Sequence, residues 1–293
     1  GLAPTAGQLR EILGMVGSGV RRLVLDISEC TSTATAWSAV FFEHLQELRE
    51  LEFVATGCKT LTDAAIEKFV ECRVDQLLRL EIQLAGCESL SPAAIDMLRT
   101  QMRLAGALRS LVLGLDGFGK QHCVMRHIAH ALEEHQELRE LTLGFAGCDV
   151  AVAAEVEILA QAIRRLGRLK TFRVDLNGCH GVESKFLVHL ILSCQQNQLH
   201  TLEFSLAGQP LLPGAVAVAF GTLIDDLTCL QRVRLDLSGA KGMDRAALNQ
   251  LAESLWNSKE IQEVTLDLRG TEADVLISTP DELTAFLMPD SQN

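Results

Sequence analysis

One short pattern recurs nine times along the chain, and it constrains the fold more than any other feature. It places apolar residues at positions 1, 4, 6 and 8, glycine at position 10 and often cysteine at position 11, as in LRELTLGFAGC, residues 138–148. The copies begin at Val20, Leu48, Leu77, Leu108, Leu138, Leu169, Leu199, Leu230 and Ile261. Their spacing of 28 to 31 residues indicates stacked structural repeats, because self-similarity at such a period is the signature of a solenoid or a related array.

Each copy predicts a strand, a turn and a helix. The apolar residues at positions 4, 6 and 8 alternate with mostly polar ones, which is typical of a strand with one buried face. The glycine then allows the chain to turn out of the strand at little steric cost. Further along, apolar residues at three- and four-residue spacing predict an amphipathic helix, as at Val156, Leu159, Ala160 and Ile163. Four polar residues of that helix are expected to face solvent: Glu155, Glu157, Gln161 and Arg164.

Two helix starts can be predicted from their capping residues. Ser91 followed by Pro92 is typical of an N-cap with proline at the first helical position. Thr279, three residues before Glu282, forms a capping-box pattern and predicts a terminal helix that reaches about Leu287.

The repeats are expected to form one continuous array. A single unit of this length buries too few apolar side chains to offset the conformational entropy of ordering it, so neighbouring units must share a core. We expect an N-terminal helix, about Thr5 to Val16, within residues 1–19, nine repeats in residues 20–271, and a C-terminal helical cap and tail in residues 272–293.

The motif LxxLxLxLxGC followed by a helix resembles that of the leucine-rich repeat family, in particular its ribonuclease-inhibitor-like and cysteine-containing subtypes. The resemblance covers about residues 20–271 and implies an α/β solenoid shaped as a curved horseshoe. It implies a parallel sheet on the concave side and one helix per repeat on the convex side, in about nine repeats. The family's usual LxxLxLxxC places its cysteine two residues earlier, which implies an extended strand or a different turn here, as in protist leucine-rich repeat proteins.

The cysteines predict buried thiols in a reducing compartment. Five of them share position 11: Cys30, Cys58, Cys87, Cys148 and Cys179. Side chains on stacked parallel strands run side by side, whereas a disulfide needs side chains that converge. We therefore expect free thiols packed under the turn, with redox and metal roles as alternatives, and an intracellular location, most simply the cytoplasm or nucleus.

A metal site is considered at three residues of the fourth helix. Cys123, His127 and His130 fall at i, i+4 and i+7, a spacing that could place three ligands on one helix face. Alignment with the next helix instead puts Cys123 at a core position and His130 at an exposed one. We expect neither a metal ion nor another cofactor.

Composition and the absence of catalytic motifs narrow the function. A formal net charge of −12 argues against a general nucleic-acid or anionic-membrane surface. The longest weakly polar run, residues 211–224, is shorter than the roughly 20 residues that span a bilayer, so no membrane span is expected.

Catalytic motifs are absent from the sequence. It contains no serine-histidine-acid triad pattern, no phosphate-binding loop and no HExxH zinc motif. The glycine-containing stretch GLDGFGK, residues 114–120, lacks the Ser or Thr that follows the lysine of a phosphate-binding loop. We expect a chain that is not an enzyme.

The candidate binding residues lie at positions 5 and 7, which should project from the concave sheet. They are Glu52, Glu81, Gly114, Gly144, Arg173, Asp175, Arg234 and Asp236. Arg173 and Arg234 could also pair with Asp175 and Asp236 across strands, and the two glycines could let a partner approach the sheet closely.

A second candidate surface is a basic stripe at position 2, where helix passes into strand. It comprises Arg21, Arg49, Arg109, Arg139, Lys170 and His200. These cations could satisfy the last carbonyls of the preceding helices, or they could form a ladder that suits an acidic partner.

These observations favour a non-enzymatic scaffold that binds a protein partner through the concave or rim surface. A repeat array extends surface without an enclosed pocket, and the resemblance implies the same use. The low aromatic content of 4% argues against aromatic-anchored recognition of glycans or bases. Alternatives are the substrate-receptor (F-box-type) component of a ubiquitin ligase, a structural subunit of a larger complex, and a regulator of a small GTPase or another enzyme.

Overall fold

The computed structural model describes residues 19–28, 47–70, 75–117, 124–148, 153–179, 182–196, 198–209 and 212–287. The expected N-terminal helix lies outside the described residues, and so do Cys30 and Cys123. Where the chain is described, the predicted strands and helices can be compared with it directly.

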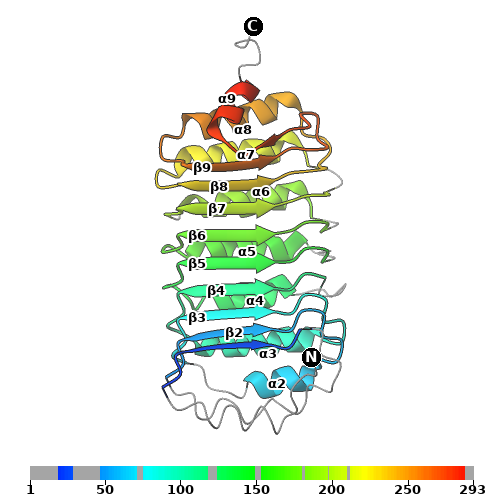
Figure 1. The fold of residues 1–293 in the computed structure, drawn as a ribbon, viewed down its shortest axis with the longest axis vertical. Coiled ribbons are helices and arrows are strands. Elements are labelled where there is room, and N and C mark those ends of the chain that lie inside the picture. Colours follow the sequence, from blue (N-terminus) through cyan, green and yellow to red (C-terminus); the bar gives the residue numbers. More distant parts are fainter. Residues whose placement is uncertain are drawn as a thin grey trace.

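Nine strands lie side by side in the order in which they occur along the chain (Figure 1). They are β1 Arg22–Asp26, β2 Glu50–Val54, β3 Arg79–Gln83, β4 Ser110–Gly114, β5 Glu140–Gly144, β6 Thr171–Asp175, β7 Thr201–Ser205, β8 Arg232–Asp236 and β9 Glu263–Asp267. Each spans positions 3 to 7 of its repeat, and neighbours are parallel and paired without offset, so Leu141 of β5 faces Leu111 of β4 and Phe172 of β6. The predicted parallel sheet is confirmed.

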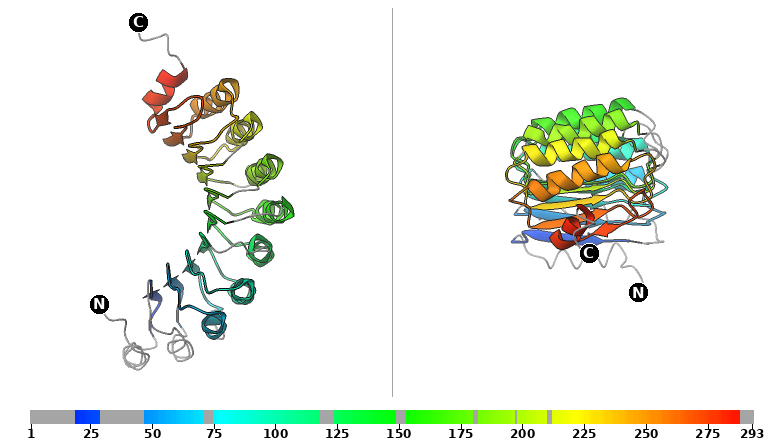
Figure 2. Two further views of the ribbon diagram at one scale, coloured as in Figure 1. Left: turned by 90° about the vertical axis from the view of Figure 1, so that its right-hand side faces the viewer. Right: turned by 90° about the horizontal axis from the view of Figure 1, so that it is seen from above.

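The helices form a second layer on the convex side of this sheet, and the whole molecule is an arc (Figure 2). They are α2 Asp63–Val70, α3 Pro92–Leu104, α4 Val124–Leu132, α5 Ala153–Arg165, α6 Ser184–Leu192 with a 3-10 turn η2 Ser193–Gln196, α7 Gly214–Asp226 and α8 Arg245–Asn257. Adjacent helices are stacked in the same order as the strands. The predicted curved solenoid is therefore confirmed.

The glycine column is explained by the turn that follows each strand. In all eight repeats with glycine at position 10, that glycine has φ between 64° and 73°, a region that other residues rarely adopt. In every one of these repeats but the last, its amide continues the hydrogen-bond ladder beyond the strand: Gly147 N–H donates to the Asn177 carbonyl at 2.7 Å, and Gly178 N–H to the Ala207 carbonyl at 3.0 Å. The extended pairing from position 3 to position 10 agrees with the long strand or altered turn expected from the motif.

The core lies between the sheet and the helices. Leu141, Leu143 and Phe145, at positions 4, 6 and 8 of one repeat, are at most 1% exposed. Phe204 packs edge-to-face against Phe172 of the neighbouring repeat, with ring centroids 5.5 Å apart. Burial of these residues removes apolar surface from water along the whole array, which is the main stabilising contribution expected for stacked repeats.

Where the structure describes them, the position-11 cysteines are buried and lie outside any disulfide, as predicted. Cys58, Cys87, Cys148 and Cys179 are each 0% to 7% exposed. Three of them donate to the position-8 carbonyl of the preceding repeat: Cys87 Sγ to Ala55 at 3.0 Å, Cys148 Sγ to Leu115 at 3.2 Å and Cys179 Sγ to Phe145 at 2.9 Å. In the seventh repeat, the amide of Gln209 makes the same bond to Leu176 at 2.7 Å. The column therefore links neighbouring repeats underneath the turn.

The helix-capping predictions are confirmed, and one orientation is corrected. Ser91 Oγ accepts a hydrogen bond from Ala93 N–H at 3.1 Å at the start of α3. In α5, Gln161 and Arg164 are exposed, but Glu155, expected to face solvent, is only 3% exposed. It lies in the first turn, where a carboxylate interacts favourably with the positive end of the helix dipole.

The C-terminal end contains one predicted and one unpredicted element. The terminal helix α9 spans Pro280–Leu287, and its predicted capping box is present: Glu282 N–H donates to Thr279 Oγ1, and Thr279 N–H donates to Glu282 Oε2. The unpredicted element is β10, Leu276–Ile277, which pairs antiparallel with β9 and ends the sheet. Among the described helices, none has the length and apolar character needed to cross a bilayer.

Candidate functional site: the concave face

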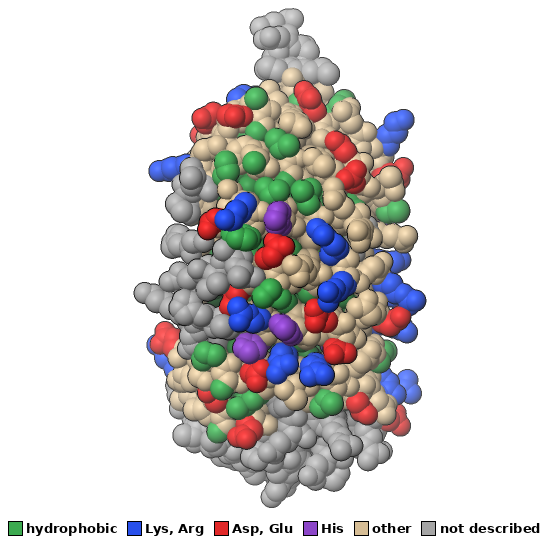
Figure 3. Space-filling model, turned by 180° about the vertical axis from the view of Figure 1, so that it is seen from behind, with side chains coloured by type: hydrophobic (Ala, Val, Ile, Leu, Met, Phe, Trp, Pro, Cys, Tyr) green, Lys and Arg blue, Asp and Glu red, His purple; other side chains and the backbone are tan. Residues whose placement is uncertain are grey.

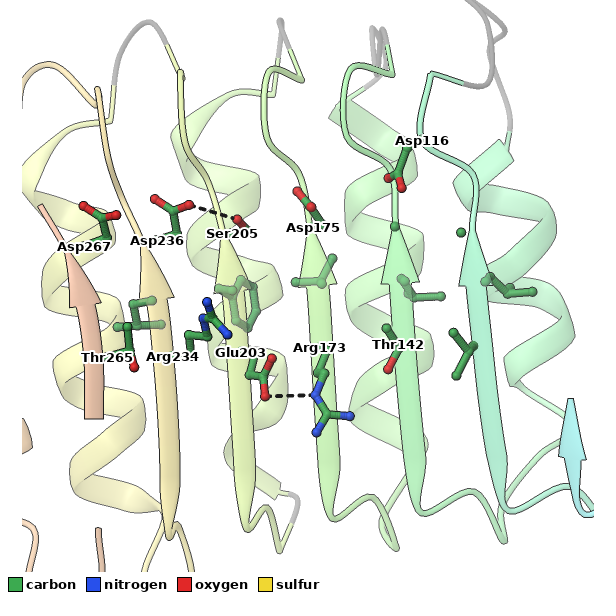
Figure 4. Close-up of a pocket in the computed structure, with 18 of the residues that line it drawn as sticks. Asp116, Thr142, Arg173, Asp175, Glu203, Ser205, Arg234, Asp236, Thr265 and Asp267 are labelled. Carbon is green, nitrogen blue, oxygen red and sulfur yellow. Dashed lines mark hydrogen bonds and ion pairs between the residues drawn. The ribbon is translucent and has the colours of Figure 1, made fainter. Parts of the chain in front are cut away.

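A hollow of about 720 Å³ lies on the concave face (Figure 4). We call it the concave hollow. Side chains from β4 to β9 line most of it, with Gln83 of β3 at one end and Leu276 and Ser278 at the other. The strand alternation predicted from the sequence creates this surface, because residues at positions 5 and 7 point away from the helices.

The middle of the concave hollow contains one paired and one unpaired arginine. Arg173 Nε lies 2.9 Å from Glu203 Oε1, across the boundary between β6 and β7. Arg234, the corresponding residue of β8, is exposed and has no ion-pair or hydrogen-bond partner within the described part of the chain. Thr142 and Thr265 occupy the same position on β5 and β9. The centre therefore presents a free guanidinium and two hydroxyls to a bound molecule.

A row of carboxylates lies where the strands of the concave hollow end (Figure 4). We call this the acidic edge; its members are Asp116, Asp175, Asp236 and Asp267. Burial raises the pKa of Asp175, and the neighbouring carboxylates of Asp116 and Asp236 raise it further, against the opposing effect of the Asn177 N–H. In contrast, hydrogen bonds from the Arg269 side chain lower the pKa of Asp267.

These carboxylates also support the turns that follow the strands. Where position 7 is aspartate, one oxygen accepts from the position-9 N–H of its own repeat, as from Asn177 to Asp175 at 2.9 Å and from Ser238 to Asp236 at 3.0 Å. In the repeat with Gly144 at position 7, the preceding repeat supplies the acceptor: Ala146 N–H donates to Asp116 Oδ1 at 2.8 Å. The acidic edge is thus part of the framework as well as a source of negative charge.

A side chain from the preceding repeat lies over each of the two candidate glycines. A Cβ at Gly114 would lie 1.7 Å from Gln83 Oε1, and a Cβ at Gly144 would lie 2.8 Å from Asp116 Oδ1. Gly144 therefore gives Asp116 room to reach the next turn. The structure gives these glycines an intramolecular role, and their contact with a partner stays a prediction.

The structure brings six of the eight candidate residues together. Gly114, Gly144, Arg173, Asp175, Arg234 and Asp236 line the concave hollow. Glu81 lies on the same face beyond the hollow and pairs with Arg79 at 2.9 Å, and Glu52 lies 3.5 Å from Arg22. Arg79 lies on the same strand as Glu81, and neither Arg79 nor Arg22 is a candidate residue, so these are not the pairs expected among the candidate charges.

Several lining residues were not singled out from the sequence. Glu203, Thr142 and Thr265 occupy the position-5 column, so the alternation predicts that they face the concave side, although they are not among the candidate binding residues. Asp116 at position 9 lies outside both candidate columns, and Ser278 belongs to the unpredicted segment around β10. No periodic signal could have placed these last two residues in the hollow.

The histidines considered as metal ligands have other surroundings. His127 Nδ1 lies 3.1 Å from Asp96 Oδ1 on the neighbouring helix, and His130 is exposed. Across the described ranges, no group of three or more His, Cys, Asp or Glu residues is arranged to hold a metal ion.

Units of about 30 residues, each with a strand, a glycine turn and a helix, are thus stacked with their strands parallel and in register. The chain has a leucine-rich-repeat fold. Its assignment to the ribonuclease-inhibitor-like subtype stays a prediction.

No protein-family model matches the sequence, and no curated protein matches it significantly. Among solved structures, human trophoblast glycoprotein (5T4, Wnt-activated inhibitory factor 1) is similar at 17% identity, over 83% of this chain and 78% of that one, with a TM-score of 0.43. The leucine-rich repeat-containing protein LegL7 of Legionella pneumophila is similar at 13% identity, over 97% and 95% of the two chains, with a TM-score of 0.47.

Proposed function

We propose that this leucine-rich repeat chain is a non-enzymatic scaffold that binds a protein partner through its concave face. The observation that carries the proposal is the concave hollow, a polar surface built by many neighbouring strands with the unpaired Arg234 near its centre. Rigid neighbouring strands hold these groups in place, so a partner can bind without ordering the surface first.

The shape and chemistry of the hollow suit a protein surface. It spans the strands of several repeats, whereas small-molecule sites are usually mostly apolar clefts with few polar groups. An exposed arginine surrounded by hydroxyls and carboxylates is typical of a binding surface, since arginine is enriched among the residues that dominate protein interfaces.

The proposal can be tested by reversing the charge of Arg234. Arg234→Glu should abolish recovery of the partner from native extract, because the central cation is replaced by an anion beside the acidic edge. The matched control is Arg164→Glu, the same charge change at an exposed site on α5 of the convex layer. Recovered proteins are quantified by mass spectrometry, and thermal unfolding checks that both variants fold.

A partner that the wild type and the Arg164→Glu variant recover, and that the Arg234→Glu variant loses, supports the proposal. Equal recovery with all three proteins would contradict it. The same experiment separates the alternatives: ubiquitin-ligase adaptor proteins are expected with the F-box-type hypothesis, and stoichiometric companions with the subunit hypothesis.

A further inference from the structure

Three cations form a continuous row on the rim at which the strands begin. Arg109, Arg139 and Lys170 occupy position 2 of three consecutive repeats, and each is exposed. We call them the rim cations. Lys and Arg side chains project at several levels along this edge of the molecule, the right-hand edge in Figure 3.

Backbone pairing holds the rim cations next to one another. Arg139 N–H donates to the Arg109 carbonyl at 2.8 Å, and Lys170 N–H donates to the Arg139 carbonyl at 2.8 Å. Neighbouring strands are about 4.8 Å apart, so the three positive charges are stacked at short intervals. Like charges on directly opposed residues of neighbouring strands repel one another and destabilise the pairing.

No carboxylate in the described part of the chain neutralises the rim cations within 4.0 Å. The acidic side chains of this rim have other partners: Glu140 accepts from Ser110 at 3.0 Å and lies 4.0 Å from Arg79, and Glu137 pairs with Arg168. The fold therefore leaves the rim cations without counter-charges although carboxylates are close by.

Two position-2 side chains elsewhere in the stripe contact carbonyls, but these carbonyls are not the expected last carbonyls of a described preceding helix. Arg49 Nη1 lies 3.4 Å from the Leu48 carbonyl and also contacts Gln76, and His200 Nδ1 lies 2.9 Å from the Gln198 carbonyl. None of the three rim cations makes a side-chain hydrogen bond among the described residues. Support of the fold thus does not account for this part of the stripe.

We propose that the rim cations bind an acidic, extended segment of a protein partner. In an extended segment, residues i and i+2 point to the same side about 6.6 Å apart. Three acidic residues at alternate positions would therefore lie within reach of three cations about 4.8 Å apart, because Arg and Lys side chains are long and flexible. The acidic edge on the opposite side of the sheet would repel the same segment and so fix which rim it occupies.

A polypeptide fits this row better than a nucleic acid. The chain carries a net charge of −12, and the row contains only three cations with acidic side chains on both flanks. Nucleic-acid surfaces depend on many phosphate contacts and on positive potential over a large area. A short acidic segment needs only local positive charge, which the rim cations supply.

The inference can be tested with a labelled synthetic peptide of alternating Glu and Ser residues, using fluorescence anisotropy at low salt. The triple variant Arg109→Glu, Arg139→Glu and Lys170→Glu should bind it at least about tenfold more weakly than the wild type, equivalent to about 1.4 kcal/mol. The control reverses three other exposed cations, Lys59→Glu, Arg164→Glu and Lys241→Glu. Its net charge is the same, and it should bind within about twofold of the wild type.

Three results would overturn the inference: no peptide binding by the wild type, equal loss of binding in both triple variants, or tighter binding of a single-stranded RNA of similar length than of the peptide. The second result would show that net charge, and not the row, determines binding. This inference rests on a protein partner, as the proposed function does. Each of the two proposals can nevertheless be refuted without the other. Partner recovery that depends on Arg234 without peptide binding at the rim would refute only the rim inference, and the reverse would refute only the concave-face proposal.

Discussion

Burial changes the chemistry of individual side chains in the repeat interior. Burial raises the pKa of Cys179 to about 12 and that of Cys194 to about 12. Both thiols therefore stay protonated at neutral pH, and Cys179 remains the donor to the Phe145 carbonyl. Since the thiolate is the reactive form of cysteine, these residues serve packing and hydrogen bonding.

His135 predicts a pH dependence of stability. It is fully buried, and burial lowers its pKa from the ordinary value of 6.5. Below about pH 6.5 the unfolded chain takes up a proton that the folded chain does not, so this residue makes stability fall as the pH decreases. Leu166 stands at the corresponding place in the next repeat, so His135→Leu should fold and should lose less stability on acidification.

The measurement is urea unfolding of both proteins at pH 7.5, 6.5 and 5.5. The difference in unfolding free energy between His135→Leu and the wild type should grow in favour of the variant as the pH falls. A difference that stays constant over this range would show that His135 is not held neutral by burial.

At the scale of the elements, the sequence pattern predicts the features that recur from repeat to repeat and misses those that occur only once. Strand positions, the buried face and the glycine turn follow from a period of two and a fixed offset, which explains the agreement at Leu141, Leu143 and Phe145. The pattern could not predict β10, which occurs once, or the bond from Asp116 to the next turn, which depends on a side-chain rotamer. The sequence allows several cross-strand pairings of Arg173, and only the structure shows that it pairs with Glu203.

The turn between β5 and α5 gives a prediction about coupling between neighbouring repeats. Gly144→Ala would push Asp116 away from the Ala146 N–H, because the added Cβ would lie 2.8 Å from Asp116 Oδ1. We expect it to lower the free energy of unfolding by about 1–3 kcal/mol in the wild type. In an Asp116→Ala background the hydrogen bond is already absent, so the same substitution should cost less.

Chemical unfolding of the wild type, both single variants and the double variant measures this coupling. We expect a non-additive term of at least about 0.5 kcal/mol. Additive costs would show that Gly144 and Asp116 act independently.

At the scale of the whole molecule, the acidic edge and the rim cations lie at opposite ends of the strands. The acidic edge follows the ends of the strands, the rim cations precede the starts, and the concave hollow lies between them. Because β1 to β9 are parallel and in register, the acidic edge and the rim cations each stay on one side of the arc along several repeats. Such a polarised surface can fix the orientation of a partner as well as attract it.

Photo-crosslinking tests the central claim, binding through the concave face, most directly. A photoreactive amino acid replaces Thr142, which lines the concave hollow, or Gln161, which is exposed on α5 of the convex layer. Irradiation in native extract should join the partner covalently to the chain labelled at residue 142 and not to the chain labelled at residue 161. Crosslinking of the same partner from residue 161 alone would contradict the account.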